Sequence, residues 1–199
     1  MCIASNNEEL KSVLSRINRA REKYKPENIK LLFIAEAPPE QTERFFYYEK
    51  VRDNDWLYLA IVKALCGTGT YDVAKMRLHK ERILPILQQD GIYLMDVCPI
   101  PLRNGVSAEW CKNDFVQRLE NEKSVSKAVT EIILIKANIY DCLYLELKNR
   151  NYKVQDMRIY FPSSGRQREF AEAMNNALQN IQYIQSEGMK GIKKLILKK

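Results

Sequence analysis

Residues 30–40 read KLLFIAEAPPE, an apolar run that ends in an acidic residue and two prolines. Residues 157–165 read MRIYFPSSG and repeat this order of a strand-like run followed by a proline loop. Proline lacks a backbone N–H for a sheet ladder and pushes its predecessor toward extended geometry, so we expect each strand to stop there. If both strands belong to one parallel sheet, both loops leave the same carboxyl edge, where α/β proteins commonly bind ligands.

Strand-like and helix-like segments alternate along the whole chain. The strands are expected over residues 30–35, 92–97, 131–135 and 157–160. The helices are expected from a cap at Asn6 or Asn7 to just before Pro26, over 53–66, 72–89 and 139–149, from about Ser107, and from about Gly165. Because helix-length segments connect every strand pair, we predict an α/β fold, a three-layer α/β/α sandwich with a central four-stranded parallel sheet. Its carboxyl edge is expected to carry Pro38, Asp96, Asn138 and Pro162.

Composition and charge place the chain among ordinary soluble globular proteins. It has 199 residues, of which 46% are hydrophobic and 29% charged, and no run is apolar enough for a membrane span. Five lysines and no acid fall in residues 190–199, so much of the formal charge of +7 lies at that end. We expect a single domain over 1–189, a basic C-terminal tail over 190–199, no membrane partner and a cytoplasmic location. The lysines of this tail either bind phosphates or only keep the end of the chain soluble.

Five cysteines are widely spaced and form no CxxC pair. This pattern does not resemble a disulfide framework, so reduced and partly buried thiols are expected.

Three segments carry a family resemblance. Residues 31–38 (LLFIAEAP), 91–99 (GIYLMDVCP) and 161–164 (FPSS) resemble, in order and spacing, three landmarks of the uracil-DNA glycosylase superfamily. The resemblance extends from about Lys30 to Ala177. It implies the same fold, DNA or a nucleobase or nucleotide as ligand, and hydrolysis of the N-glycosidic bond of a damaged base. The alternative is a catalytically inactive module of this fold that still binds a nucleic acid or nucleotide.

The chain departs from the family pattern at the positions that carry its chemistry. Ala35 and Pro39 stand where many members have glycine, and Phe161 stands where many have the histidine that stabilises the departing base. Asp96 takes the place of the base-reading asparagine. Because an ionised aspartate only accepts hydrogen bonds, whereas asparagine also donates, uracil itself is not the expected base.

The resemblance also assigns candidate site residues. Glu36 is the first candidate for the catalytic carboxylate and Glu40 the second, since a carboxylate near the anomeric carbon stabilises a cation-like sugar or orients water. For either acid, the alternative is a role in capping or solubilising the turn. Ser163 and Ser164, at the start of a helix, are candidates to receive the charge of the departing base or a phosphate, or they are ordinary caps.

The remaining candidates are substrate and DNA contacts. Pro38, Asp96 and Phe161 are assigned to the substrate side by their motif positions. Phe46, from the aromatic run at residues 45–48, is expected to stack on an extruded base, unless this run packs in the core. Arg166 and Arg168 are expected to contact phosphates, unless they only form a solvated face.

No metal and no cofactor are expected. Cys98 and Cys111 fall where some thermophilic family members place two ligands of an iron–sulfur cluster, but the other two ligands are not matched. An unrelated hydrolase or nucleotide-binding protein is a more remote alternative, because the chain has neither a G-x-S-x-G elbow nor a P-loop.

Overall fold

A four-stranded, fully parallel sheet forms the centre of the computed structural model, with the strand order β2-β1-β3-β4. The structure describes residues 2–102, 107–163, 165–179, 181 and 186–198, with side chains described from residue 11 onward. The strands are β1 (Leu31–Ala35), β2 (Ile92–Asp96), β3 (Glu131–Leu134) and β4 (Lys153–Val154). The predicted parallel sheet is therefore confirmed.

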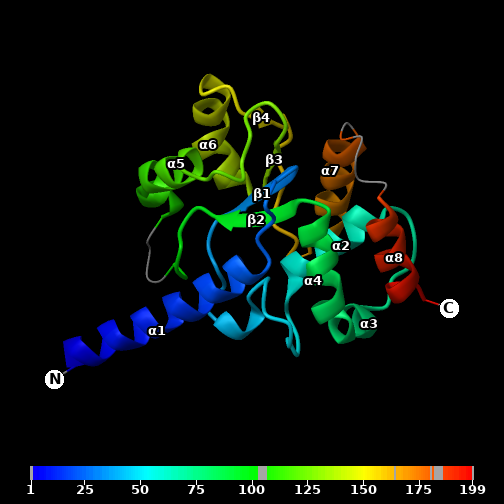
Figure 1. Ribbon diagram of the computed structural model, residues 1–199, viewed down its shortest axis with the longest axis horizontal. Coiled ribbons are helices and arrows are strands. Elements are labelled where there is room, and N and C mark those ends of the chain that lie inside the picture. The colour runs from blue at the N-terminus through cyan, green and yellow to red at the C-terminus, as the bar shows by residue number, and fades with distance from the viewer. Residues whose placement is uncertain (1, 103–106, 164, 180, 182–185, 199) are drawn as a thin grey trace.

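Helices cover both faces of the sheet, with α5 and α6 on one side and α2, α4, α7 and α8 on the other (Figure 1). This arrangement is the expected three-layer sandwich. None of the helices in the described part of the chain is both long and apolar enough to cross a bilayer. The helices are α1 (Cys2–Lys23), α2 (Trp56–Cys66), α3 (Val73–Leu78), α4 (Lys80–Gln89), α5 (Lys112–Glu120), α6 (Ala137–Asn149), α7 (Gln167–Gln179) and α8 (Glu187–Ile196), with short 3-10 turns at Thr42–Arg44 and Ala108–Cys111.

Burial of the two inner strands explains why an uninterrupted apolar run indicates a strand in this chain. All five residues of β1 are buried, and so are Ile132, Ile133 and Leu134 of β3. A strand of a parallel sheet is covered by helices on both faces, so it needs apolar side chains at successive positions and not only at alternate ones. Ala35 pairs with Asp96, and Ile34 with Leu134, so β1, β2 and β3 end close to one level at the carboxyl edge.

The fourth strand lies earlier than predicted. β4 covers Lys153–Val154, and the expected strand at residues 157–160 contributes only a parallel bridge between Ile159 and Ile135. Val154 of the short edge strand and Tyr152, which precedes the strand, are buried while Lys153 is exposed, which is the alternation of a strand covered on one face. The apolar run at 157–160 instead carries the chain past the end of β3 toward the proline loop.

Two helix boundaries also differ from expectation. The helix predicted over residues 72–89 is two helices, α3 and α4, which meet at His79. Pro85 lies inside α4 and does not end it. The first helix begins at Cys2, before the expected cap at Asn6 or Asn7.

The segment expected to be a basic tail is mostly a packed helix. α8 spans Glu187–Ile196 and contacts α2, α3 and α4. Its residues Met189, Ile192 and Ile196 are buried because they recur at helical spacing on one face, between exposed lysines. The chain then pairs Leu197 with Tyr71 in an antiparallel bridge.

Candidate functional site

A pocket of about 440 Å³ opens where the chain leaves β3 and passes beyond β4. We call it the carboxyl-edge pocket, because its walls come from segments that follow the carboxyl ends of these strands. One wall is the start of α6, and the other is the loop that leads into α7. Its lining residues are Lys136, Ala137, Asn138, Asp141, Arg158, Tyr160, Phe161, Ser163 and Arg166.

Glu36, the first residue after β1, is bound by two residues of this pocket. The ammonium of Lys136 donates to Glu36 Oε2, and Asn138 Nδ2 donates to Glu36 Oε1 at 2.7 Å. The register of the sheet explains the contact, because β1 and β3 are neighbours that end at nearly the same level. Lys136 has φ +86°, in the left-handed region that residues with a Cβ rarely adopt, and such strain is concentrated at functional sites in proteins.

The opposite wall of the pocket combines aromatic rings with arginines. The Arg166 guanidinium lies 4.2 Å from the centroid of the Tyr160 ring, within cation–π distance. Arg158 donates to both carboxylate oxygens of Asp141, at 2.9 and 2.7 Å, and this bonding lowers the pKa of Asp141. Phe161 is half-buried and packs against the core while it lines the pocket. The wall can therefore offer flat apolar surface and hydrogen-bond donors at the same time.

The structure brings together part of the predicted site. Phe161, Ser163 and Arg166 line the carboxyl-edge pocket, whereas Ser164 lies outside the described residues. Arg168 is exposed on α7 and forms an ion pair with Glu172 at 3.4 Å, and Glu40 is exposed beyond Pro39.

The two prolines expected at this edge are both buried. Pro38 is buried directly after Ala37. Pro162 is buried too and lines a separate pocket of about 320 Å³ between α2 and α7. The loop at 161–163 therefore contributes residues to two different pockets.

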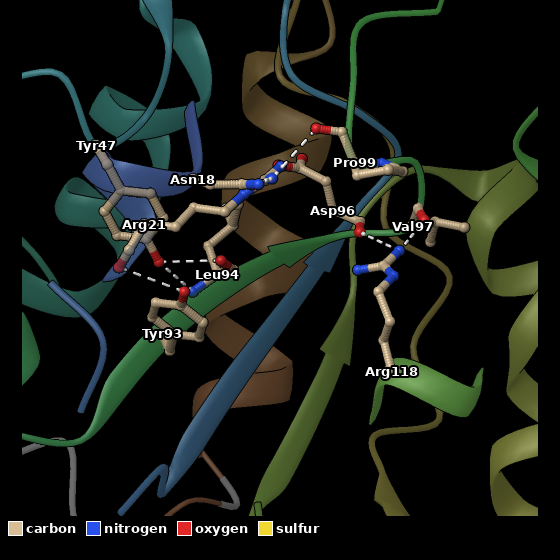
Figure 2. Close-up of polar contacts among 9 residues, drawn as sticks. All are labelled: Asn18, Arg21, Tyr47, Tyr93, Leu94, Asp96, Val97, Pro99 and Arg118. Atoms are coloured by element: carbon tan, nitrogen blue, oxygen red, sulfur yellow. Dashed lines mark hydrogen bonds and ion pairs between the residues drawn. The ribbon is translucent and has the colours of Figure 1, made fainter. Parts of the chain in front are cut away.

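Asp96 does not line the pocket, and its predicted role in reading a base is not supported by its position. It is 3% exposed, and its Oδ2 accepts a hydrogen bond from Arg21 of α1 at 2.6 Å (Figure 2). Burial raises the pKa of Asp96 above its usual value, against the opposing effect of the Arg21 guanidinium. From the other side, Arg118 donates to the backbone oxygen of Val97 at 2.5 Å. Asp96 is thus committed to anchoring α1 against the end of β2.

Phe46 is a core residue and not a surface for base stacking. It is 7% exposed and makes edge-to-face contacts with Tyr47 and Tyr58. The neighbouring Tyr47 reaches the outer edge of β2, where its hydroxyl accepts from Leu94 N at 2.7 Å and donates to Leu94 O at 3.0 Å (Figure 2). The alternative considered for this aromatic run, core packing, is correct for both residues.

Cys98 and Cys111 form a disulfide, which corrects the expectation that they are reduced thiols. The bridge joins the segment after β2 to the 3-10 turn before α5. Sequence spacing did not reveal it because the pairing depends on how the intervening loop returns. Within the described part of the chain, no group of three or more His, Cys, Asp or Glu side chains could hold a metal ion.

Sequence reasoning assigned no role to Lys136, Arg158 or Tyr160. A signal for Lys136 was available, because the residues directly after a parallel strand belong to the carboxyl edge. Arg158 and Tyr160 were not considered as site residues because the sequence places them in a predicted strand. In the structure they lie in the loop beyond β4.

No protein-family model, curated protein or solved structure matches this chain, so a proposal for its function has to rest on the geometry of its own residues.

Proposed function

We propose that the carboxyl-edge pocket binds a nucleobase, free or as part of a nucleotide or DNA, and that the protein is a divergent relative of the uracil-DNA glycosylases. One observation carries the proposal. Glu36 from the first motif is bound by Lys136 and Asn138, and these two residues line the same pocket as Phe161 and Ser163 from the last motif. Glu36 does not itself line the cavity, but its contacts connect the first motif to the residues that do, and the volume of the cavity is typical of small-molecule sites.

The chemistry of the lining suits a flat, polar ligand. A nucleobase presents an apolar face and a rim of hydrogen-bond donors and acceptors, and proteins hold such bases between apolar walls with polar groups at the rim. Phe161 and Tyr160 supply ring surface, the amide of Asn138 both donates and accepts, and the Ser163 hydroxyl does the same.

Binding is tested by isothermal titration with free nucleosides and nucleotides. Asn138→Ala is expected to weaken binding on the order of 10-fold, since a good hydrogen bond to a bound ligand contributes about 1.4 kcal/mol. The matched control is Asn149→Ala, which removes an exposed amide from the last turn of the same helix. Equal affinities for the two variants would place the ligand elsewhere and overturn the proposal.

A second candidate function is slow hydrolysis of an N-glycosidic bond. It is favoured by the two hydrogen bonds that orient the Glu36 carboxylate at the pocket. In such a reaction the bond between the sugar and the base breaks, water adds to the anomeric carbon, and a proton passes to the departing base. Glu36 would stabilise the cationic sugar or orient the water, and the Lys136 ammonium would stabilise the negative charge on the base.

The rate is expected to be low, because Phe161 carries no imidazole and loss of one charge-stabilising group costs on the order of 100-fold. Labelled strands that contain uracil, hypoxanthine, xanthine or mispaired thymine are incubated with the protein, and abasic sites are then cleaved with alkali. Glu36→Gln should abolish the strand breaks, and Phe161→His should increase them. Rapid turnover of uracil that is indifferent to Glu36→Gln would show that another group is catalytic.

A further inference from the structure

A second hollow lies between α1 and the segment that follows the first proline loop. It has a volume of about 390 Å³, and we call it the α1 groove. Its walls include Arg16, Arg19 and Lys23 from α1, together with Tyr24, Tyr48 and Lys50. No residue that lines the α1 groove also lines the carboxyl-edge pocket.

The charge of the α1 groove is strongly positive and mostly uncompensated. Lys23 is paired with Glu49, which also accepts a hydrogen bond from Tyr24, and these two contacts lower the pKa of Glu49. Among the side chains described, from residue 11 onward, no carboxylate lies within ion-pairing distance of the other three cations of the groove, Arg16, Arg19 and Lys50, although Lys50 contributes to the lowered pKa of Glu49. Cations without such partners are available for an anionic ligand.

Aromatic rings lie between these cations. The Arg16 guanidinium is 5.8 Å from the centroid of the Tyr48 ring. Tyr48 is half-buried, and its hydroxyl is buried without a hydrogen-bond partner among the described residues. Tyr24 and Tyr47 stack with their ring centroids 6.3 Å apart, but they are only 4% and 3% exposed, so they support the groove from behind and Tyr48 is the ring that a ligand can contact. Phosphate-binding cations interleaved with aromatic faces are the usual composition of surfaces that bind single-stranded nucleic acid.

The orientation of α1 directs the groove toward the carboxyl edge. Near the start of β2, the Gln88 side chain donates to the backbone oxygens of Lys23 and Lys25, whereas Arg21 reaches Asp96 at the end of β2. The helix therefore runs antiparallel to β2 and passes the carboxyl edge as it approaches its N-terminus. Figure 1 shows its N-terminal part extending away from the sheet. Arg16 and Arg19 lie on the side of Arg21 that leads toward this edge.

We infer that the α1 groove binds a single-stranded nucleic acid, with phosphates at Arg16, Arg19 and Lys50 and one base against the ring of Tyr48. The inference rests on the proposed function for the class of ligand, and it adds a separate surface that holds the strand. A single strand fits better than a duplex, because bases in a duplex are stacked on one another and cannot reach a protein ring.

The test measures fluorescence anisotropy of a labelled oligothymidine of about 12 nucleotides at several salt concentrations. The double variant Arg16→Ala/Arg19→Ala is expected to lose on the order of 10-fold in affinity. Its plot of log K against log salt should be shallower by about 1.4, since each phosphate contact on a single strand contributes about 0.7. The matched control is Lys123→Ala/Lys148→Ala, which removes two exposed positive charges that line neither the α1 groove nor the carboxyl-edge pocket. Its salt slope should equal that of the wild type.

The aromatic part is tested with Tyr48→Leu and Tyr48→Phe. Leucine should reduce affinity for the oligothymidine on the order of 5-fold without changing the salt slope, because stacking on one base contributes about 1 kcal/mol or more. Phenylalanine keeps the ring and should bind like the wild type, which separates loss of stacking from loss of folding. A Tyr48→Phe variant as weak as Tyr48→Leu would overturn the stacking assignment.

Other outcomes identify other ligands. If polyglutamate competes as well as unlabelled oligothymidine, the groove accepts any polyanion and the nucleic-acid assignment is wrong. Duplex DNA bound as tightly as the single strand would also overturn the inference. The groove variants should leave titration with uncharged nucleosides unchanged, whereas Asn138→Ala should weaken it. A failure of the groove is therefore distinguishable from a failure of the carboxyl-edge pocket.

Discussion

The carboxyl-edge pocket and the α1 groove are both rich in cations, but they differ in what those cations contact. Around the pocket each cation has a carboxylate partner, as in the pair of Arg158 with Asp141. In the groove Arg16, Arg19 and Lys50 have no such partner among the described residues. The number of basic residues is therefore a poor guide to where an anion binds, and their pairing is a better one.

This difference assigns different ligand groups to the two regions. A phosphate that enters the carboxyl-edge pocket has to displace a carboxylate from its cation, so part of the attraction is lost. A phosphate that enters the α1 groove displaces only water and counterions. The pocket thus favours an uncharged polar group such as a base, and the groove favours a charged backbone.

The largest expected effect comes from breaking the ion pair of Arg21 with Asp96, which anchors α1 to the end of β2. Arg21→Met leaves the buried Asp96 carboxylate without its closest cation and should cost about 3–5 kcal/mol in the free energy of unfolding. Urea denaturation followed by circular dichroism measures the change. The deficit should shrink as the pH is lowered, because a protonated Asp96 carries no charge to compensate.

The control for this variant is Arg19→Met on the same helix, which removes a cation with no carboxylate partner in the described part of the chain. It should change the free energy of unfolding by no more than about 0.5 kcal/mol. Similar losses in both variants would mean that the ion pair does not anchor the helix.

A third environment for a cation is the apolar interior, and Lys80 occupies it. Its side chain is fully buried, 3.9 Å from Asp55 Oδ2 and 4.1 Å from the centroid of the Tyr58 ring, and the ammonium has no hydrogen-bond partner among the described residues. Burial lowers the pKa of Lys80 to about 7, against the opposing effect of Asp55, and Arg77 adds to the shift. The unfolded chain holds this proton up to about pH 10.

Between about pH 7 and pH 9 the unfolded state therefore binds a proton that the folded state lacks, so stability should rise with pH by about 2 kcal/mol. Below that range both states are protonated and the dependence disappears. Urea midpoints across the range measure it, and Lys80→Met should flatten the profile. The exposed Lys123→Met serves as the control and should keep the slope. An equal slope in both variants would show that another group titrates.

The smallest effect tests pairing directly by converting a paired cation into an unpaired one. Glu36→Gln removes the carboxylate that Lys136 contacts and should strengthen binding of nucleoside monophosphates about 5-fold, which corresponds to about 1 kcal/mol. Affinity for uncharged nucleosides should change little. Isothermal titration with nucleosides and with nucleoside monophosphates measures both affinities. An equal gain for both ligand classes would show that the pairing of Lys136 with Glu36 does not exclude phosphates from the pocket.

The sequence predicts the central sheet well because parallel strands buried on both faces leave an unbroken apolar signature, as in residues 31–35. It predicts the edge poorly. β4 is only two residues long, and the alternation of buried and exposed residues over 152–154 is a weaker sequence signal than the apolar run at 157–160. In α8 the helical spacing of three apolar residues was outweighed by the abundance of lysine.

The candidate site was predictable only to the extent that it follows from strand order. Proximity of Glu36 to the end of β3 is a consequence of neighbouring strands, and residues that follow strands converge on the carboxyl edge. The ion pair of Asp96 could not be predicted in this way, because its partner Arg21 lies on a helix 75 residues earlier in the chain. Pairing between side chains on distant elements has no local sequence signal.

The two hydrogen bonds of the Tyr47 hydroxyl to Leu94 have a consequence for association between molecules. β2 is an edge strand, and an exposed edge offers free backbone N–H and C=O groups to a strand from another chain. One phenolic hydroxyl occupies both the donor and the acceptor of Leu94 at the middle of that edge. A single aromatic side chain thus blocks the register that an incoming strand would need, and it protects the sheet against edge-to-edge aggregation.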